Sequence, residues 1–264
     1  MEVHAHSHTA RKKWTHYFWE FLMLFLAVTL GFFVENQREH YIEHQRAEIY
    51  AASMKANLQV DTSELIQVVH RGTYASSYLD TFLLLLSGND ISKIPTGKLY
   101  WYGLFGGYLR GFQSNDATFQ QMKSSGSLRY FSNATLEQNI SNYDQLMRSM
   151  QVLTGIDQEV QLEVRKLRGK IFDFKYNNAA NLTVRRAVYE NFNQPAIDSF
   201  ISTDPPLLTF DKTIINEYAE LCRSRNLRQQ LINAKEALEL ATEIITQLTK
   251  QYHLSADRRT PLEK

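Results

Sequence analysis

The 264-residue chain contains a single cysteine, Cys222, which excludes an intrachain disulfide and any zinc site built from cysteines. It also contains only five prolines and eleven glycines, the residues that most often end helices and form tight turns. Because these residues are scarce while leucine, glutamine, glutamate and alanine are abundant, the composition predicts an all-α fold with long helices.

The sequence also lacks a large excess of positive or negative residues. It contains 29 Lys and Arg residues and 28 Asp and Glu residues, for a formal net charge of +1. A protein dedicated to DNA or RNA usually carries a basic surface, so we expect no nucleic-acid partner. Hydrophobic residues make up 44% of the chain and charged residues 22%, a balance that excludes wholesale disorder.

Common enzyme signatures are absent from the sequence. It contains no P-loop, no Gly-x-Ser-x-Gly and no His-Glu-x-x-His, and the glycines from Gly103 to Gly111 do not form a dinucleotide-binding pattern. Cys222 lies among apolar residues of an expected helix, where a small core residue is more common than a nucleophile. We therefore predict no catalytic residue, no cofactor and no enzymatic activity.

One long hydrophobic run is present near the N-terminus, and it ends at Val34. Counted from Trp14 it comprises 21 residues. As a helix this segment is about 31 Å long, close to the ~30 Å hydrocarbon thickness of a bilayer. Trp14, Tyr17 and Trp19 fit an aromatic belt at one membrane interface, and Phe21 begins the uncharged stretch. We predict a transmembrane anchor over residues 14–34.

Two alternatives remain for this segment. A cleaved signal peptide also has basic residues followed by a short apolar run, but no Ala-x-Ala-like cleavage site follows here, and a charged helical segment continues directly from Glu35. A buried helix of a soluble protein is the other alternative.

The basic residues that flank the span predict its orientation. Three of them are clustered at residues 11–13, whereas Arg38 and Arg46 are dispersed among four glutamates on the other side. We therefore expect residues 1–13 to form a short cytoplasmic tail and residues 35–254 to form a helical domain across the membrane, followed by a frayed tail, residues 255–264.

Heptad patterns mark two later segments. In the first, which begins after Asn133, one position holds Leu136, Tyr143, Met150, Val164 and Ile171, and the other holds Leu146, Leu153, Val160, Leu167 and Phe174. Asn139 and Asp157 interrupt this pattern. In the second, a helix expected from about Asp211, the two positions hold Leu231, Leu238, Ile245 and Tyr252, and Leu227, Ala234, Ala241 and Leu248. An isolated helix with one apolar face is unstable in water, so we predict an elongated antiparallel helical bundle, with an intermolecular coiled coil as the alternative.

Other residues predict where helices are interrupted. Gly72 is expected to interrupt the helix that follows the anchor, and the glycine- and aromatic-rich segment 97–112 is expected to be a packed connector or the lining of a ligand cleft. Asp116 and Asn133 can cap helices, the first ending near Gly126. We expect a loop at Pro195, Pro205 and Pro206.

A few polar or small residues near the span are candidates for function. His40 and His44 share one helical face and could bind a divalent metal, although a solvated surface is the more ordinary interpretation. A carboxyl near a span, here Glu20, can serve an ion pathway or can reach the interface. Ala27 and Gly31 form a small-xxx-small pair that lets two helices approach closely.

Three segments together resemble a known family. They are the opening His4-x-His6-x-His8 with Arg11-Lys-Lys-Trp-Thr-His-Tyr-Phe-Trp-Glu-Phe-Leu-Met-Leu-Phe-Leu-Ala-Val28, then Gly31-Phe-Phe-Val-Glu-Asn-Gln-Arg-Glu-His40, and then Thr118-Phe-Gln-Gln-Met-Lys-Ser-Ser-Gly-Ser-Leu-Arg129 followed by Leu136 and Tyr143. With the residues between the first two they cover about a quarter of the chain, and they are similar to single-span envelope proteins of Gram-negative bacteria, a family of unknown function. The resemblance implies an inner-membrane anchor and a helical periplasmic domain.

Topology and heptads without catalytic residues predict a membrane-anchored, non-enzymatic scaffold or interaction subunit. Its expected partners are the membrane and either other envelope proteins or further copies of the chain. Two alternatives remain open, namely an extracytoplasmic small-molecule sensor that acts through a partner, and an accessory subunit of an ion-driven envelope machine that uses Glu20.

Overall fold

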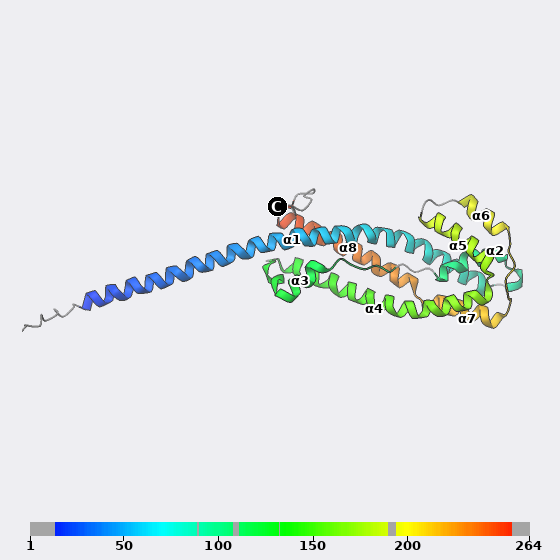
Figure 1. Cartoon of the computed structure of the whole chain (residues 1–264), viewed down its shortest axis with the longest axis horizontal. Coiled ribbons are helices and arrows are strands. Elements are labelled where there is room, and N and C mark those ends of the chain that lie inside the picture. The colour runs from blue at the N-terminus through cyan, green and yellow to red at the C-terminus, as the bar shows by residue number, and fades with distance from the viewer. Residues whose placement is uncertain (1–13, 89, 108–110, 132, 190–193, 255–264) are drawn as a thin grey trace, which may run out of the picture. The chain divides into compact units, whose positions relative to one another are not determined.

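A computed structural model describes residues 14–88, 90–107, 111–131, 133–189 and 194–254 (Figure 1). All regular secondary structure in these ranges is helical, apart from one bridge between Phe172 and Leu207, so the all-α prediction is confirmed. The tails predicted at residues 1–13 and 255–264 lie outside the described residues. The chain divides into two compact units, Met1–Tyr50 and Ala51–Lys264.

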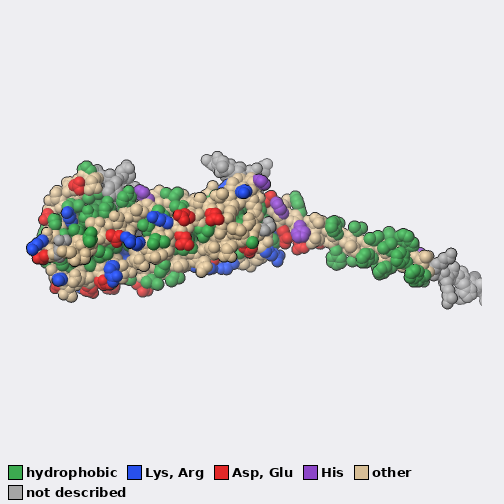
Figure 2. All heavy atoms as spheres, turned by 180° about the vertical axis from the view of Figure 1, so that it is seen from behind, with side chains coloured by type: hydrophobic (Ala, Val, Ile, Leu, Met, Phe, Trp, Pro, Cys, Tyr) green, Lys and Arg blue, Asp and Glu red, His purple; other side chains and the backbone are tan. Residues whose placement is uncertain are grey.

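In the first unit, the described residues belong to a single helix, α1 (Trp14–Gly88), which also contributes to the second unit. Large apolar side chains cover its first turns and are open to solvent: Trp14 is 81%, Phe21 64% and Val34 63% exposed (Figure 2). This stretch is long and apolar enough to cross a membrane, and none of it is buried. A signal sequence or a core helix of a soluble protein can meet the same criteria of length and composition, so the transmembrane anchor stays a prediction.

The second unit is built around α4 (Ala134–Ile171), which packs against α7 (Lys212–Ser224) and α8 (Leu227–Gln251) (Figure 1). Residues 51–88 of α1 join them, with the ring of Phe82 5.7 Å from that of Tyr218. The shorter helices are η1 (Ile91–Lys93), α2 (Thr96–Gly103), η2 (Leu104–Gly107), α3 (Ala117–Ser125), η3 (Ser127–Tyr130), α5 (Phe174–Tyr189) and α6 (Gln194–Ser202).

Burial follows one of the two predicted heptad positions more closely than the other. In α8, the position of Leu227, Ala234, Ala241 and Leu248 is buried throughout, whereas that of Leu231 is partly exposed. In α4, the position of Leu136 is largely buried, but the second position includes an exposed Leu153. The side chain predicted to complete that second position, Phe174, belongs to α5 and is 80% exposed, so this part of the pattern is wrong.

Two predictions about where helices break are also wrong. Gly72 does not end α1, and its missing side chain instead leaves room for Leu231, whose Cδ1 atom would lie 3.3 Å from a Cβ at this position. The single helix expected from Asp211 is broken into α7 and α8 at Asn226, which adopts the left-handed conformation with φ of 53°. Asparagine tolerates this conformation better than most residues.

Other helix ends follow the sequence. The Asn133 side chain accepts hydrogen bonds from the backbone N–H groups of Thr135 and Leu136 at 3.0 and 3.2 Å. Asp116 precedes α3, which ends at a left-handed Gly126, although the Asp116 carboxylate accepts from the side chain of Gln120 and not from the helix backbone. Pro205 and Pro206 lie in the loop before α7, whereas Pro195 lies in the first turn of α6, a position that proline tolerates.

The segment expected to be a connector, 97–112, is helical over most of its described residues and contributes to the core. Tyr100, Trp101 and Phe105 are buried. The Tyr100 hydroxyl donates to the Pro206 carbonyl at 2.9 Å and accepts from the Asp173 N–H at 2.8 Å, so this buried polar group is fully paired. Tyr100, Trp101 and Phe105 therefore pack the protein interior, whereas Phe112 of the same segment lines a cavity that is described below.

A buried ion pair crosses the same core. The guanidinium of Arg225, at the junction of α7 and α8, contacts both carboxylate oxygens of Asp157 at 2.9 and 2.7 Å and also donates to the Gly106 carbonyl. Asp157 is 4% and Arg225 2% exposed. Asp157, one of the two residues that interrupt the heptad pattern, thus has a buried partner at the junction of α7 and α8.

Candidate functional site

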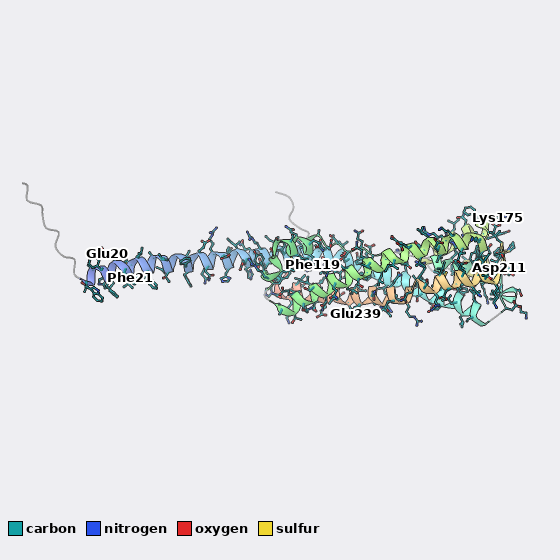
Figure 3. All side chains as sticks on the ribbon, turned by 90° about the horizontal axis from the view of Figure 1, so that it is seen from below. Glu20, Phe21, Phe119, Lys175, Asp211 and Glu239 are labelled. Carbon is teal, nitrogen blue, oxygen red and sulfur yellow. The ribbon has the colours of Figure 1, made fainter. Side chains whose placement is uncertain are left out.

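The residues singled out near the span do not converge on a site. Glu20 contacts His16, one turn earlier on the same helix, at 3.0 Å, and its side chain is half exposed (Figure 3). His40 and His44 each lie near a glutamate, at 3.7 Å from Glu43 and 3.5 Å from Glu48. Among the described residues, no group of three or more potential metal ligands comes together.

The small pair in the anchor is accessible. Ala27 and Gly31 are both exposed, and a Cβ added to Gly31 would have no neighbour within 4 Å. A second helix could therefore approach this face without a steric conflict. Tyr17 and Trp19 are exposed on the preceding turns, together with the rest of the predicted anchor.

Cys222 is fully buried in α7. Burial raises the pKa of its thiol to about 12, and the hydrogen bond with Tyr218 opposes this shift only in part. The thiol is therefore protonated at neutral pH, and a protonated, inaccessible thiol is a poor nucleophile. This finding supports its interpretation as a core residue.

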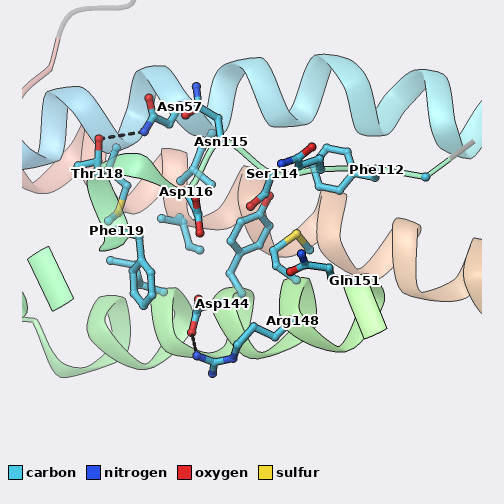
Figure 4. Close-up of a pocket in the computed structure, with 18 of the residues that line it drawn as sticks. Asn57, Phe112, Ser114, Asn115, Asp116, Thr118, Phe119, Asp144, Arg148 and Gln151 are labelled. Carbon is cyan, nitrogen blue, oxygen red and sulfur yellow. Dashed lines mark hydrogen bonds and ion pairs between the residues drawn. The ribbon is translucent and has the colours of Figure 1, made fainter. Parts of the chain in front are cut away.

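The second unit contains a cavity of about 420 Å³ between α1 and α4 (Figure 4). The segment 111–116 and the start of α3 close one side, and α8 contributes Ile244 to the lining. Its lining comprises apolar, amide, hydroxyl and charged side chains: Met54, Asn57, Leu58, Phe112, Gln113, Ser114, Asn115, Asp116, Thr118, Phe119, Ile140, Tyr143, Asp144, Met147, Arg148, Gln151, Thr154, Gln158 and Ile244, together with Gly111.

The aliphatic and methionine side chains of the lining come from three helices. Met54 and Leu58 of α1, Ile140 of α4 and Ile244 of α8 are each at most 5% exposed, and Met147 of α4 is partly buried. Such side chains form a hydrophobic floor, whereas exposed residues such as Gln151 lie at the rim. A cavity with an apolar interior and a few polar groups is the usual form of a small-ligand site.

Asp61 of α1 lies behind the cavity and holds its wall in place. One carboxylate oxygen accepts from the Asn115 N–H and the other from the Tyr143 hydroxyl, each at 2.8 Å. Burial raises the pKa of Asp61, while these two hydrogen bonds oppose the shift. Burial and the nearby carboxylate also raise the pKa of Tyr143, so that hydroxyl stays protonated and remains a donor.

The rim carries two further contacts (Figure 4). The Asn57 amide donates to the Thr118 hydroxyl at 2.9 Å, which joins α1 to α3. Asp144 is 8% exposed and pairs with Arg148 one turn later on α4, at 2.5 Å, and with Lys123 at 3.8 Å. The acid and bases at this rim therefore largely neutralise one another.

Chemically, the arrangement is suited to binding. Its polar groups are mainly amides and hydroxyls, which donate and accept hydrogen bonds without being nucleophiles at neutral pH. The sequence left open a cleft lined by segment 97–112, and Gly111 and Phe112 of that segment do line this cavity. The rest of the lining was not predicted, because it comes from α1, α3, α4, α8 and residues 113–116, which lie far apart in the sequence. The one local signal was the polar run Gln113-Ser-Asn-Asp116 directly after an aromatic-rich segment.

The family resemblance of the three sequence segments stays a prediction. Comparisons of the chain with protein-family models, with curated proteins and with solved structures gave no match.

Proposed function

We propose that the chain is a single-span membrane protein whose second unit is a non-enzymatic interaction domain. Trp14 to Val34 would cross the bilayer, and the heptad-bearing helices would form an elongated antiparallel bundle. One observation carries the functional part of this proposal, namely the 420 Å³ cavity with a hydrophobic floor and a rim of amide side chains. A domain that only spaced other components apart would not need such a cavity.

The membrane part rests on the exposure of the apolar stretch in α1. No residue of its most hydrophobic window is buried within the protein, so another environment must cover these side chains. The distribution of basic residues supports a cytoplasmic N-terminus, and the family resemblance supports the inner membrane of a Gram-negative bacterium with the main domain in the periplasm. Other envelope proteins, or a second copy of the chain that packs at Ala27 and Gly31, are the proposed partners.

Fractionation tests the anchor. Full-length protein should stay with membranes during carbonate and high-salt extraction, because a hydrophobic span is not released by breaking ionic contacts. Protein found in the soluble fraction and shortened at its N-terminus would instead identify a cleaved signal peptide.

For the orientation, alkaline phosphatase fused after Lys264 should be active in a bacterial host, and a fluorescent protein that matures only in the cytoplasm should stay dark there. The reverse pattern would place the domain in the cytoplasm.

A sensor of small molecules is the second candidate, favoured by the size of the cavity, which lies in the range of pockets for small ligands. A metabolite that binds the folded protein raises its apparent thermal stability by mass action. A thermal-shift screen of the full chain in detergent should then give saturable hits. No hit, together with a reproducible crosslinked protein partner, would favour the interaction domain.

A further inference from the structure

One wall of the cavity is a segment that lies outside the helices. Six consecutive residues, 111–116, line it, so this segment runs along the cavity and does not merely touch it (Figure 4). The segment contains no helix and no strand. Among the described residues, no hydrogen-bond partner is found for the backbone N–H or carbonyl groups of Phe112, Gln113 and Ser114.

Both the segment and the helix that follows it are held in place. The Asn115 N–H donates to the buried Asp61, and Thr118 of α3 accepts from Asn57. A segment fixed in this way loses little conformational freedom when a ligand pairs with it, and this lowers the entropic cost of binding. Its open backbone groups therefore form a preorganised edge for another extended chain.

The side chains around this edge suit the same kind of ligand. Gln113, Gln151 and Gln158 line the cavity and are exposed. A primary amide can donate to a peptide carbonyl and accept from a peptide N–H at the same time. Since Asp144 is already paired with Arg148 and Lys123, the rim favours an uncharged ligand over a strongly charged one.

The floor supplies a place for one apolar side chain. It contains two methionines, Met54 and Met147, beside Leu58, Ile140 and Ile244. Methionine side chains adapt their shape and are frequent at surfaces that accept more than one sequence. An extended peptide directs alternate side chains to opposite faces, so a residue that faces the floor has neighbours that face solvent.

We propose that this cavity binds a short, extended, uncharged peptide segment of a partner protein. The peptide pairs its backbone with residues 112–114 and inserts one aliphatic side chain between Met54 and Met147. This inference rests on the proposed interaction domain and specifies its partner, and it requires neither the membrane span nor its orientation.

The test uses the full chain in detergent and pools of blocked tetrapeptides. Each peptide carries photo-leucine at the second position and Gly, Ala, Ser, Asn or Gln elsewhere, with acetyl and amide ends. Irradiation should label residues of the floor, and a matching pool with ordinary leucine should compete in a saturable manner. A pool whose backbone nitrogens are methylated should compete at least tenfold less well, because it can no longer donate to the edge.

Two variants of exposed glutamines in α4 form a matched pair. Gln151→Trp places a large ring at the rim and should reduce labelling at least tenfold, whereas Gln145→Trp, on the same helix but outside this cavity, should leave it unchanged. Circular dichroism of both variants establishes that the fold is retained.

Three results would overturn the inference: labelling absent or unsaturable in every pool, equal competition by the methylated pool, or competition by neutral sugars in place of peptides. Carbonate extraction tests the membrane anchor separately from the peptide site. If the unmodified chain stays in membranes but is not labelled by any peptide pool, the peptide site is rejected and the anchor still stands.

Discussion

The buried pair of Asp157 and Arg225 gives the sharpest prediction on stability. Replacing Asp157 by leucine restores the heptad pattern of α4, and from the sequence alone this change should stabilise the helix. The structure predicts the opposite, because Arg225 is 2% exposed and would keep its charge without the carboxylate that accepts from its Nε and Nη2 atoms. Removing one member of a buried pair costs about 3–5 kcal/mol. That loss is a large share of a typical unfolding free energy of about 5–15 kcal/mol.

A surface pair in the same unit provides the control. Arg228 contacts Asp80 at 3.1 Å, but these side chains are 75% and 53% exposed, so water can solvate either charge when the other is removed. Asp80→Leu should therefore cost at most about 1 kcal/mol. The double variant Asp157→Leu, Arg225→Met should recover most of the loss at Asp157, since neither charge remains buried.

Urea unfolding followed by tryptophan fluorescence measures these differences. Trp101 is buried in the second unit, and replacing Trp14 and Trp19 by phenylalanine leaves it as the reporter, since the sequence contains three tryptophans. The three variants and their parent are compared in the same detergent. Equal losses in the free energy of unfolding for Asp157→Leu and Asp80→Leu would refute the reasoning, because the two losses are expected to differ only through the burial of the Asp157 pair.

Three further predictions concern other buried positions. Burial raises the pKa of Asp61 above the ordinary 3.8, so the folded protein binds this proton more tightly than the unfolded chain. The contribution of Asp61 to the free energy of unfolding is therefore fully present below the ordinary pKa of 3.8. It is lost as the pH rises through the raised pKa of the folded state. Asp61→Asn should remove that decline in a urea series from pH 4 to 8, and an unchanged slope would contradict the assignment. Cys222, with a thiol pKa of about 12, should resist iodoacetamide at pH 8 in the folded protein and react in 8 M urea, and rapid labelling without urea would show that the site is accessible. Gly97→Ala should cost about 1–3 kcal/mol, because its Cβ would collide with the Ile201 carbonyl oxygen. Gly155→Ala, in open space on α4, should instead stabilise by about 0.5–1 kcal/mol, and the same sign for both changes in thermal unfolding would be inconsistent with this geometry.

The parts of the fold that the sequence predicts are those with a local cause. The buried position of α8 follows from apolar residues that recur every seven positions, and the cap of α4 follows from the short side chain of Asn133, which reaches its own helix. Asn226 shows the limit of this reasoning. The heptad residues begin only at Leu227, directly after the break between α7 and α8, and no proline or glycine marks that break. Nothing near Arg225 in the sequence indicates that its side chain, at this break, pairs with Asp157 of α4.

The cavity depends on relations that a linear pattern does not contain. In the sequence, its polar residues resemble ordinary solvent-exposed residues of separate helices. They line one cavity because segment 111–116 lies between α1 and α4. Tyr143 illustrates the difference. Its heptad position correctly predicts burial, but nothing near it in the sequence indicates that its hydroxyl donates to Asp61, 82 residues earlier.

The carboxyl group of Asp61 also has a consequence for how the helices align. Heptad stripes match equally well after a shift of seven residues, or about 10.5 Å along a helix, so hydrophobic pairing alone permits several alignments. At any shifted alignment of α1 and α4, Tyr143 would no longer face Asp61, and the buried carboxyl would lose one of its two donors. An unpaired buried polar group costs about 1–3 kcal/mol. We infer that Asp61 favours the observed register of α1 and α4, because its two donors reach it only in this alignment.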